Sequence, residues 1–235
     1  MRNDYVFPGR SVAGISMILG PLLLVTGTLL RSQVNFFFPD QLKAMSEHPG
    51  LMTAAYTCFL AGNVLLWPAI VALATRIGQT RPTLAAWGGV LVLIGLFERT
   101  FHAGIDQAAR GLTERRGPGF AESVVSESYQ DIHLFSFLSF TIMFGWYVLA
   151  FAAYRAKALG IVQAIGLATM GLLPLGVLKG TELLSIIGTV GLCVALVPAG
   201  IGALLEGPKP SRRTVLLTAI AIPALGALAY VSTLG

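Results

Sequence analysis

The chain has 235 residues, of which 55% are hydrophobic and only 11% are charged, and its mean hydropathy is +0.76. Because soluble domains carry about 25% charged residues, this composition excludes an ordinary soluble protein and predicts an all-α, polytopic membrane protein. The formal net charge of +5 would suggest nucleic acid as the partner of a soluble protein. In a membrane protein the positive net charge is better explained by basic residues that set the orientation of the chain in the membrane. We therefore expect no nucleic-acid partner.

Apolar segments long enough to cross a membrane, about 20 residues each, recur along the whole sequence. We expect seven, so that residues 1–235 form a single seven-helix transmembrane domain. In chain order they cover residues 11–30, 51–76, 83–102, 131–154, 159–177, 183–205 and 214–234. The first is too long for the core of a signal peptide and is interpreted as a retained helix. Cys58 and Cys193 fall inside these segments and are expected to be small core residues.

The distribution of charge predicts the orientation of the chain. An odd number of crossings puts the N-terminus and the connections after the second, fourth and sixth segments on one side. Nine basic residues lie there with only two acids, Asp4 and Glu206; the basic ones are Arg2, Arg10, Arg76, Arg81, Arg155, Lys157, Lys209, Arg212 and Arg213. The positive-inside rule therefore predicts a cytoplasmic N-terminus and an external C-terminus, in a bacterial cytoplasmic membrane.

The two longest connections lie on the opposite, acid-rich side. Residues 31–50 contain a predicted interfacial helix over 40–47, and residues 109–130 contain a Gly-Pro-Gly turn followed by a short helix over 120–128. We therefore expect a functional site with covering loops on this side.

The third segment ends in residues that a membrane helix seldom contains. Glu98, His102 and Asp106 are four positions apart and so share one helix face. Glu98 lies about 22 Å along the helix from Thr83, which is well inside a hydrocarbon core of about 30 Å. Ionisable side chains at this depth usually face the protein interior and mark a site.

The fourth segment carries a stripe of aromatic residues below a histidine. His133, Phe137, Phe140, Phe144 and Tyr147 are spaced by four, three, four and three positions and therefore share a face. Such a stripe suits a pocket for a greasy or cationic species, although it also suits packing against neighbouring helices. In the second segment, Asn63 is expected to bond to a neighbouring helix or to a ligand.

Three chemistries fit the cluster of Glu98, His102, Asp106 and His133. A carboxyl group in an apolar site can stay protonated and donate a proton to an olefin or epoxide. Two histidines and a carboxylate can also form a catalytic zinc site with one open position. Alternatively, the cluster is structural or relays protons, as in a transporter or an accessory subunit, with Glu98 paired to Arg99 or Arg110.

With its size, its seven apolar segments and an intramembrane acid at Glu98 near aromatic residues, the chain resembles the small bacterial membrane-bound terpene cyclases. That group includes the actinobacterial cyclases of indole sesquiterpenoids and resembles the fungal meroterpenoid cyclases of the pyripyropene and paxilline pathways. The resemblance implies a metal-independent cyclisation of a lipophilic prenylated substrate, started by protonation and requiring no cofactor. The fungal enzymes place a second acid in the last helix. That helix has no acid here, so Asp106 becomes the candidate.

The sequence thus predicts a membrane-embedded terpene cyclase, with a non-enzymatic membrane protein or a zinc-dependent hydrolase as the alternatives. The expected partners are a lipophilic small molecule and membrane lipids. The candidate catalytic residues are Glu98, His102, Asp106 and His133, and the candidate substrate-binding residues are Phe101, Phe137, Phe140, Phe144, Tyr147 and Asn63.

Overall fold

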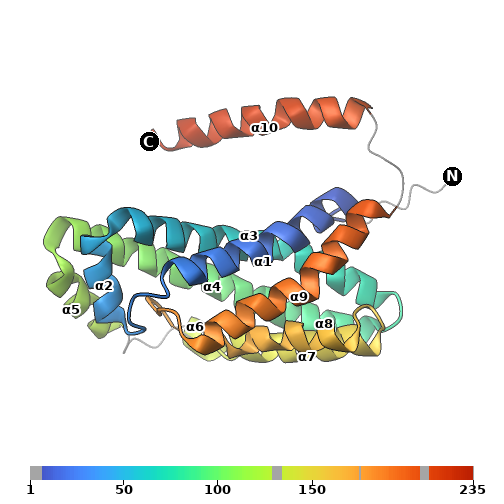
Figure 1. Ribbon diagram of the computed structural model, residues 1–235, viewed down its shortest axis with the longest axis horizontal. Coiled ribbons are helices and arrows are strands. Elements are labelled where there is room, and N and C mark those ends of the chain that lie inside the picture. The colour runs from blue at the N-terminus through green and yellow to red at the C-terminus, as the bar shows by residue number, and fades with distance from the viewer. Residues whose placement is uncertain (1–6, 129–133, 175, 207–211, 235) are drawn as a thin grey trace. The chain divides into compact units, whose positions relative to one another are not determined.

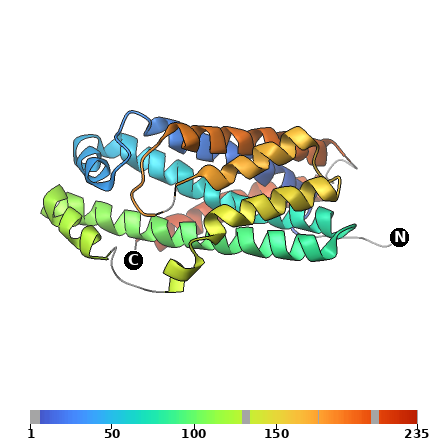
Figure 2. The same cartoon turned by 90° about the horizontal axis from the view of Figure 1, so that it is seen from below.

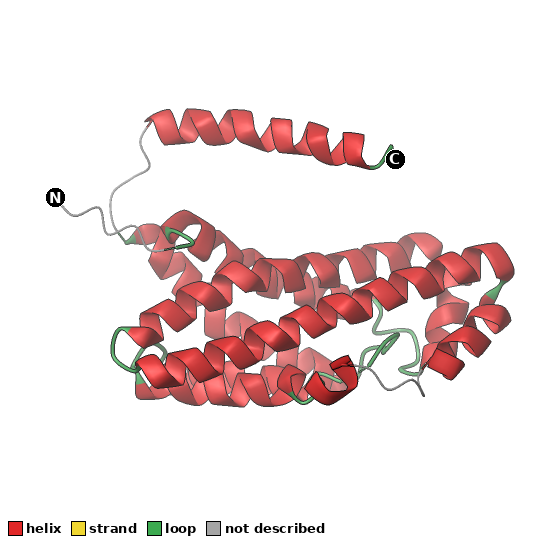
Figure 3. Cartoon of the chain, turned by 180° about the vertical axis from the view of Figure 1, so that it is seen from behind, coloured by secondary structure: helices red, strands yellow, loops and turns green. Residues whose placement is uncertain are grey.

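The computed structural model describes residues 7–128, 134–174, 176–206 and 212–234, and within these ranges it consists of helices and loops without a strand (Figures 1 and 3). The helices are α1 (Arg10–Leu30), α2 (Phe38–Glu47), α3 (Pro49–Gly78), α4 (Pro82–Arg116), α5 (Pro118–Ser128), α6 (Leu134–Leu138), α7 (Thr141–Arg155), α8 (Ile161–Ala168), the 3-10 helix η1 (Thr169–Leu172), α9 (Leu183–Leu205) and α10 (Arg212–Ser232).

Six helical segments of the described chain are long and apolar enough to cross a membrane. They are α1, α3, α4, the pair α6–α7 taken together, α9 and the part of α10 from Val215 to Ser232. Their length and composition are those of a multi-pass membrane protein. The predicted helical fold class is confirmed, whereas the fifth predicted segment differs from the prediction.

The chain divides into two compact units, Met1–Leu204 and Leu205–Gly235. In the second unit, every side chain that the structure describes in α10 is exposed. In the first unit, α1, α3, α4, α7 and α9 run side by side, and α2 and α5 lie together at one end of them (Figures 1 and 2). The site lies entirely in this first unit.

Helix α4 is the central positioning element, and glycines bring α7 close to it. A Cβ added at Gly145 would lie 2.9 Å from main-chain atoms of Leu91 and Val92, and one at Gly88 would lie 2.9 Å from Cα of Leu149. The backbones of α4 and α7 therefore touch, a mode of packing common between membrane helices. This contact fixes which face of α7 is buried.

Helix α4 is longer than the predicted third segment, because it continues beyond His102 as far as Arg116. The added residues mix apolar and charged side chains, and Arg110 and Glu114 pair across one turn at 2.9 Å. The helix ends at Gly117, whose positive φ of 87° favours glycine, and Pro118 begins α5. The prediction stopped early because it followed hydrophobicity alone.

The fifth predicted segment, residues 159–177, is helical only from Ile161 to Leu172. Pro174 explains the stop: a residue before proline avoids the helical region, and Leu173 is extended with ψ of 133°. The chain then continues without helix until α9 begins at Leu183. Seven full-length helical spans are therefore not present in the described chain.

The fourth predicted segment contains two helices, α6 and α7, separated by Ser139 and Phe140.

The predicted short helices over 40–47 and 120–128 are confirmed as α2 and α5, each slightly longer at its N-terminal end. Their buried side chains, including Leu42, Met45 and Val125, form a second apolar core apart from that of the helix bundle.

Candidate functional site

The predicted polar face lies on a continuous stretch of α4. Glu98 is completely buried, with 0% exposure, while His102 and Asp106 are partly buried. His102 lines both a small cavity that also contains Asp106 and a larger apolar cavity. The face therefore leads from the buried carboxyl group of Glu98, past His102, to Asp106.

Two side chains lie against the Glu98 carboxyl group. Ser139, in the turn between α6 and α7, donates a hydrogen bond of 2.6 Å from its hydroxyl group to Oε1 of Glu98. Nε2 of His102 lies 4.0 Å from the same oxygen. Because Ser139 comes from a different helical segment, this hydrogen bond joins the broken fourth segment to α4. Hydrophobicity alone gave no reason to select Ser139, so sequence reasoning missed it.

A cavity of about 550 Å³ with a predominantly apolar lining lies beside the residues that contact Glu98, whereas Glu98 itself is not among its lining residues. Its wall includes Ser139 and His102, the two residues that contact Glu98, together with Phe101, Ile105, Leu112 and Val125. The volume falls within the range of about 300–1,000 Å³ that is typical of small-molecule pockets. A lipophilic molecule could therefore lie within reach of the polar face.

Aromatic rings lie near this acid, but they are only partly the predicted ones. Phe101 stacks on Phe135 with ring centroids 4.4 Å apart, and Phe135 also stacks on Phe97 at 6.1 Å. Phe101 lines the large cavity as predicted for a pocket residue, whereas Phe135 was not selected because it is off the predicted stripe.

The predicted aromatic stripe does not line any of the cavities described. Phe137, Phe140, Phe144 and Tyr147 are 39–70% exposed, on the outer side of α6 and α7. The opposite side of α7, with Gly145 and Trp146, is the one that packs inward. A repeat of three and four positions shows that residues share a face, but not which way that face points. The interpretation of the stripe as a pocket wall is therefore corrected.

Asn63 is buried between α3 and α4. Its side-chain amide donates hydrogen bonds to the carbonyl of Leu96 at 3.0 Å and to Oγ1 of Thr100 at 3.1 Å. Asn63 lines none of the cavities described, so its placement is that of a helix cross-link rather than a ligand contact. His133, the fourth candidate catalytic residue, lies outside the described residues.

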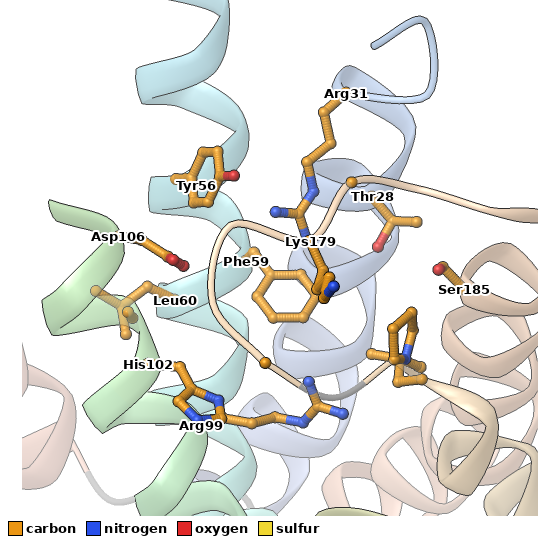
Figure 4. Close-up of a pocket in the computed structure, with 15 residues that line it drawn as sticks. Thr28, Arg31, Tyr56, Phe59, Leu60, Arg99, His102, Asp106, Lys179 and Ser185 are labelled. Carbon is orange, nitrogen blue, oxygen red and sulfur yellow. The ribbon is translucent and has the colours of Figure 1, made fainter. Parts of the chain in front are cut away.

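A second, basic pocket of about 50 Å³ opens at the same end of the bundle (Figure 4). Its charged lining residues are Arg31, Arg99, Lys179, His102 and Asp106. Oδ1 of Asp106 accepts a hydrogen bond of 2.7 Å from the backbone N–H of Leu178, which positions the segment that carries Lys179. The sequence offered no pattern for this pocket, because its cations come from three distant parts of the chain.

Within the described residues, no group of three or more His, Cys, Asp or Glu side chains is arranged to hold a metal ion. That search does not include His133. Glu98 and His102 supply two donors near each other, and Asp106 faces the basic pocket instead. The described arrangement therefore provides an acid that accepts a hydrogen bond from Ser139 and has the His102 imidazole 4.0 Å away.

Comparison of the chain with protein-family models, with curated proteins and with solved structures gave no match. The functional assignment therefore depends on the geometry of the site.

Proposed function

We propose that the protein is a membrane-embedded cyclase that starts the cyclisation of a lipophilic, isoprenoid-derived substrate by protonating it. The observation that supports this proposal is the placement of Glu98, fully buried and held by Ser139 next to a large apolar cavity. Ionisable groups inside membrane helices are expensive and usually functional. A buried carboxyl group beside an apolar pocket suits the chemistry of a proton donor.

In the proposed reaction, Glu98 donates its proton to a terminal olefin or epoxide of the bound substrate. The substrate's own double bonds then attack the resulting cation to form rings, and loss of a proton from the last cation ends the reaction. The ring of Phe101, which lines the cavity and is backed by Phe135, stabilises positive charge there. His102, 4.0 Å from the carboxyl oxygen, accepts the proton that the last cation loses and returns it to Glu98, so the reaction is an isomerisation without a redox partner.

A non-catalytic role is the second candidate, and one observation favours it. Glu98 connects α4 to the turn between α6 and α7 through Ser139, which is also what a structural cross-link would do. In that case the apolar cavity would hold a lipid or a carried molecule. The two candidates differ in whether Glu98 is needed for turnover or for stability.

We further propose that the chain crosses a bacterial cytoplasmic membrane seven times, with the N-terminus in the cytoplasm. The support is that residues 161–182 run antiparallel to α9: Gln163 bonds to Ala195 at 3.4 Å, whereas Thr169 bonds to Ile187 at 3.4 Å. At the far end, Thr181 donates to the carbonyl of Thr28 at 2.7 Å. A short helix thus lies along α9 between Ala195 and Ile187, and the described residues after it are non-helical. Non-helical backbone is tolerated at membrane depth where protein surrounds it.

The test of the cyclase is Glu98→Gln, assayed in membranes with prenylated olefins and epoxides. Because general acid catalysis contributes about 10²–10⁴-fold in rate, the variant should lose at least about a hundredfold in product formation, measured by mass spectrometry. Glu114→Gln is the matched control, since Glu114 lies on the same helix and its side chain is about half exposed. Full turnover of a confirmed substrate by Glu98→Gln would rule out Glu98 as the acid.

A further inference from the structure

The basic pocket gathers three cations that are distant in sequence. Arg31 follows the last residue of α1, Arg99 lies on α4 next to Glu98, and Lys179 lies in the non-helical segment before α9. Figure 4 shows the three side chains around one pocket. Arg31 is only 7% exposed, so its charge is removed from solvent rather than displayed on the surface.

None of these cations lies within ion-pair distance of a carboxylate in the described part of the chain, although Glu98 interacts electrostatically with Arg99 and Asp106 with Arg31. The ion pairs found there join Lys43 to Glu47, His102 to Glu98 and Arg110 to Glu114. Asp106 is the one carboxylate among the described lining residues, and its Oδ1 accepts the backbone N–H of Leu178. The pocket therefore carries an excess of positive charge, which is costly to bury without a counter-charge.

Several hydrogen-bond donors of the pocket also lack an acceptor among the described residues. Nε of Arg31, together with Nε and Nη2 of Arg99, is buried without a hydrogen-bond partner among the described residues. Because buried polar groups in folded proteins are nearly always paired, these donors indicate a missing acceptor. An acceptor that also balances the charge is an anion.

Aromatic rings hold two of the cations in place without neutralising them. The guanidinium group of Arg31 lies 4.8 Å from the ring centroids of both Tyr56 and Phe59. Nζ of Lys179 lies 5.2 Å from the ring centroid of Phe36. Cation–π contacts of this kind orient a cation while leaving its N–H groups able to donate to an anion.

Neutral donors complete the pocket. Oγ1 of Thr28 is buried without a hydrogen-bond partner among the described residues. Oγ of Ser185 accepts the N–H of Glu182 at 3.2 Å and keeps its own O–H for donation. Ser185 lies in the first turn of α9, and the N-terminal end of a helix favours negative charge.

The size and neighbourhood of the pocket narrow the class of ligand. A volume of about 50 Å³ holds roughly three to five water-sized atoms, which is the scale of one compact oxyanion. His102, Gly176 and Lys179 line both this pocket and the large apolar cavity. The cationic pocket and the apolar cavity therefore adjoin. An amphiphile could place its anionic end in the first and its apolar chain in the second.

We propose that the basic pocket binds one phosphate group at the polar end of an amphiphile whose apolar chain occupies the large cavity. Two arginines and a lysine suit a multiply charged oxyanion, since guanidinium groups bind phosphate oxygens in pairs. If the amphiphile is the substrate of the proposed cyclase, the inference rests on that proposed function. It then means that the substrate carries a phosphate group. A membrane phospholipid offers the same phosphate chemistry, so the experiment separates the two sources.

The experiment measures binding of inorganic pyrophosphate, farnesyl diphosphate, farnesol and phosphatidylglycerol to the purified full-length protein after delipidation in detergent. Isothermal titration calorimetry gives the dissociation constants, and native mass spectrometry identifies the bound species. The variants are Arg99→Gln and Lys179→Gln, and the charge-preserving Lys179→Arg accompanies them. Lys43→Gln, which removes an exposed cation outside the pocket, is the matched control.

We expect pyrophosphate and farnesyl diphosphate to bind the wild type, and farnesol to bind more weakly. Loss of one charged hydrogen bond should weaken both phosphate ligands roughly ten- to a hundredfold in Arg99→Gln and in Lys179→Gln. Lys179→Arg and Lys43→Gln should bind like the wild type. Preference for farnesyl diphosphate over phosphatidylglycerol identifies a phosphorylated substrate, and the reverse preference identifies a lipid headgroup; both support a phosphate site.

Equal binding of pyrophosphate and farnesyl diphosphate to wild type, Arg99→Gln and Lys179→Gln would overturn the proposal. So would the absence of any phosphate binding to wild-type protein that remains folded by circular dichroism. Lys179 lies outside the helices, so Lys179→Gln tests the pocket without changing a helix. Calorimetry tests the phosphate site and the turnover of Glu98→Gln tests the proton donor, so failure of one is distinguished from failure of the other.

Discussion

At the scale of single residues, Glu98 and its neighbours show how much chemistry depends on contacts between segments. Its position on α4 made it conspicuous in the sequence, because an acid at that depth is unusual. The hydroxyl group that holds it belongs to Ser139, which lies 2.6 Å away but in another segment. Sequence reasoning could therefore identify the acid but not its hydrogen-bond donor.

Asn63 provides a test at this scale, because its placement separates a structural role from a substrate-binding one. Asn63→Leu removes the hydrogen bonds to Leu96 and Thr100 while keeping a similar volume. We expect a loss of about 0.6–1.7 kcal/mol in stability, the range measured for hydrogen bonds between membrane helices, with ligand affinity unchanged. Thermal unfolding in detergent and ligand titration measure the two effects. Unchanged stability with weakened ligand binding would contradict the cross-link.

At the scale of elements, hydrophobicity located most helices well, and the deviations have local causes. The segment 183–205 was predicted with the bounds that α9 has, because it is uniformly apolar. The prediction of a complete fifth helix was wrong, because Pro174 stops η1 in a segment that remains apolar. The outward direction of the aromatic stripe on α6 and α7 depends on the glycine contact with α4, which no pattern within the stripe contains.

The contact between α4 and α7 can be tested with two glycines that differ in their surroundings. Gly145→Ala places a Cβ 2.9 Å from the backbone of α4, whereas Gly104→Ala places one where no atom lies within 4 Å. We expect Gly145→Ala to destabilise the protein by about 1–3 kcal/mol through overpacking. Gly104→Ala should be neutral or stabilise it by up to about 1 kcal/mol, since alanine favours helix. Thermal unfolding compares them, and equal effects would mean that the helices do not pack as described.

At the scale of the whole molecule, the sequence predicted a multi-pass helical protein but not the contacts between segments that are distant in the chain. Arg31, Arg99 and Lys179 stand in three different regions of the chain, and nothing in the sequence links any one of them to the other two. The bonds from Leu178 to Asp106 and from Thr181 to Thr28 bring the third region to the other two. Such contacts between distant segments have no periodicity, so a single sequence does not reveal them.

The proposed seven crossings make a definite prediction about sidedness. Cysteines introduced one at a time at Ser46, Gln79 and Glu182, after replacement of Cys58 and Cys193, would occupy exposed positions. If residues 161–182 cross the membrane, a membrane-impermeant maleimide should label Ser46→Cys and Glu182→Cys from one side and Gln79→Cys from the other. Labelling of Glu182→Cys from the side of Gln79→Cys would leave only six crossings.

The non-helical segment before α9 also determines when the site can form during synthesis. Arg31 and Arg99 enter the membrane with the first three long helices, but Lys179 and the N-terminal end of α9 are made much later. A nascent chain that ends before Lys179 therefore lacks the third cation of the basic pocket. The anion can bind only after nearly all of the first unit has been inserted. Its binding then stabilises the complete protein relative to the incompletely inserted chain, which lacks the site.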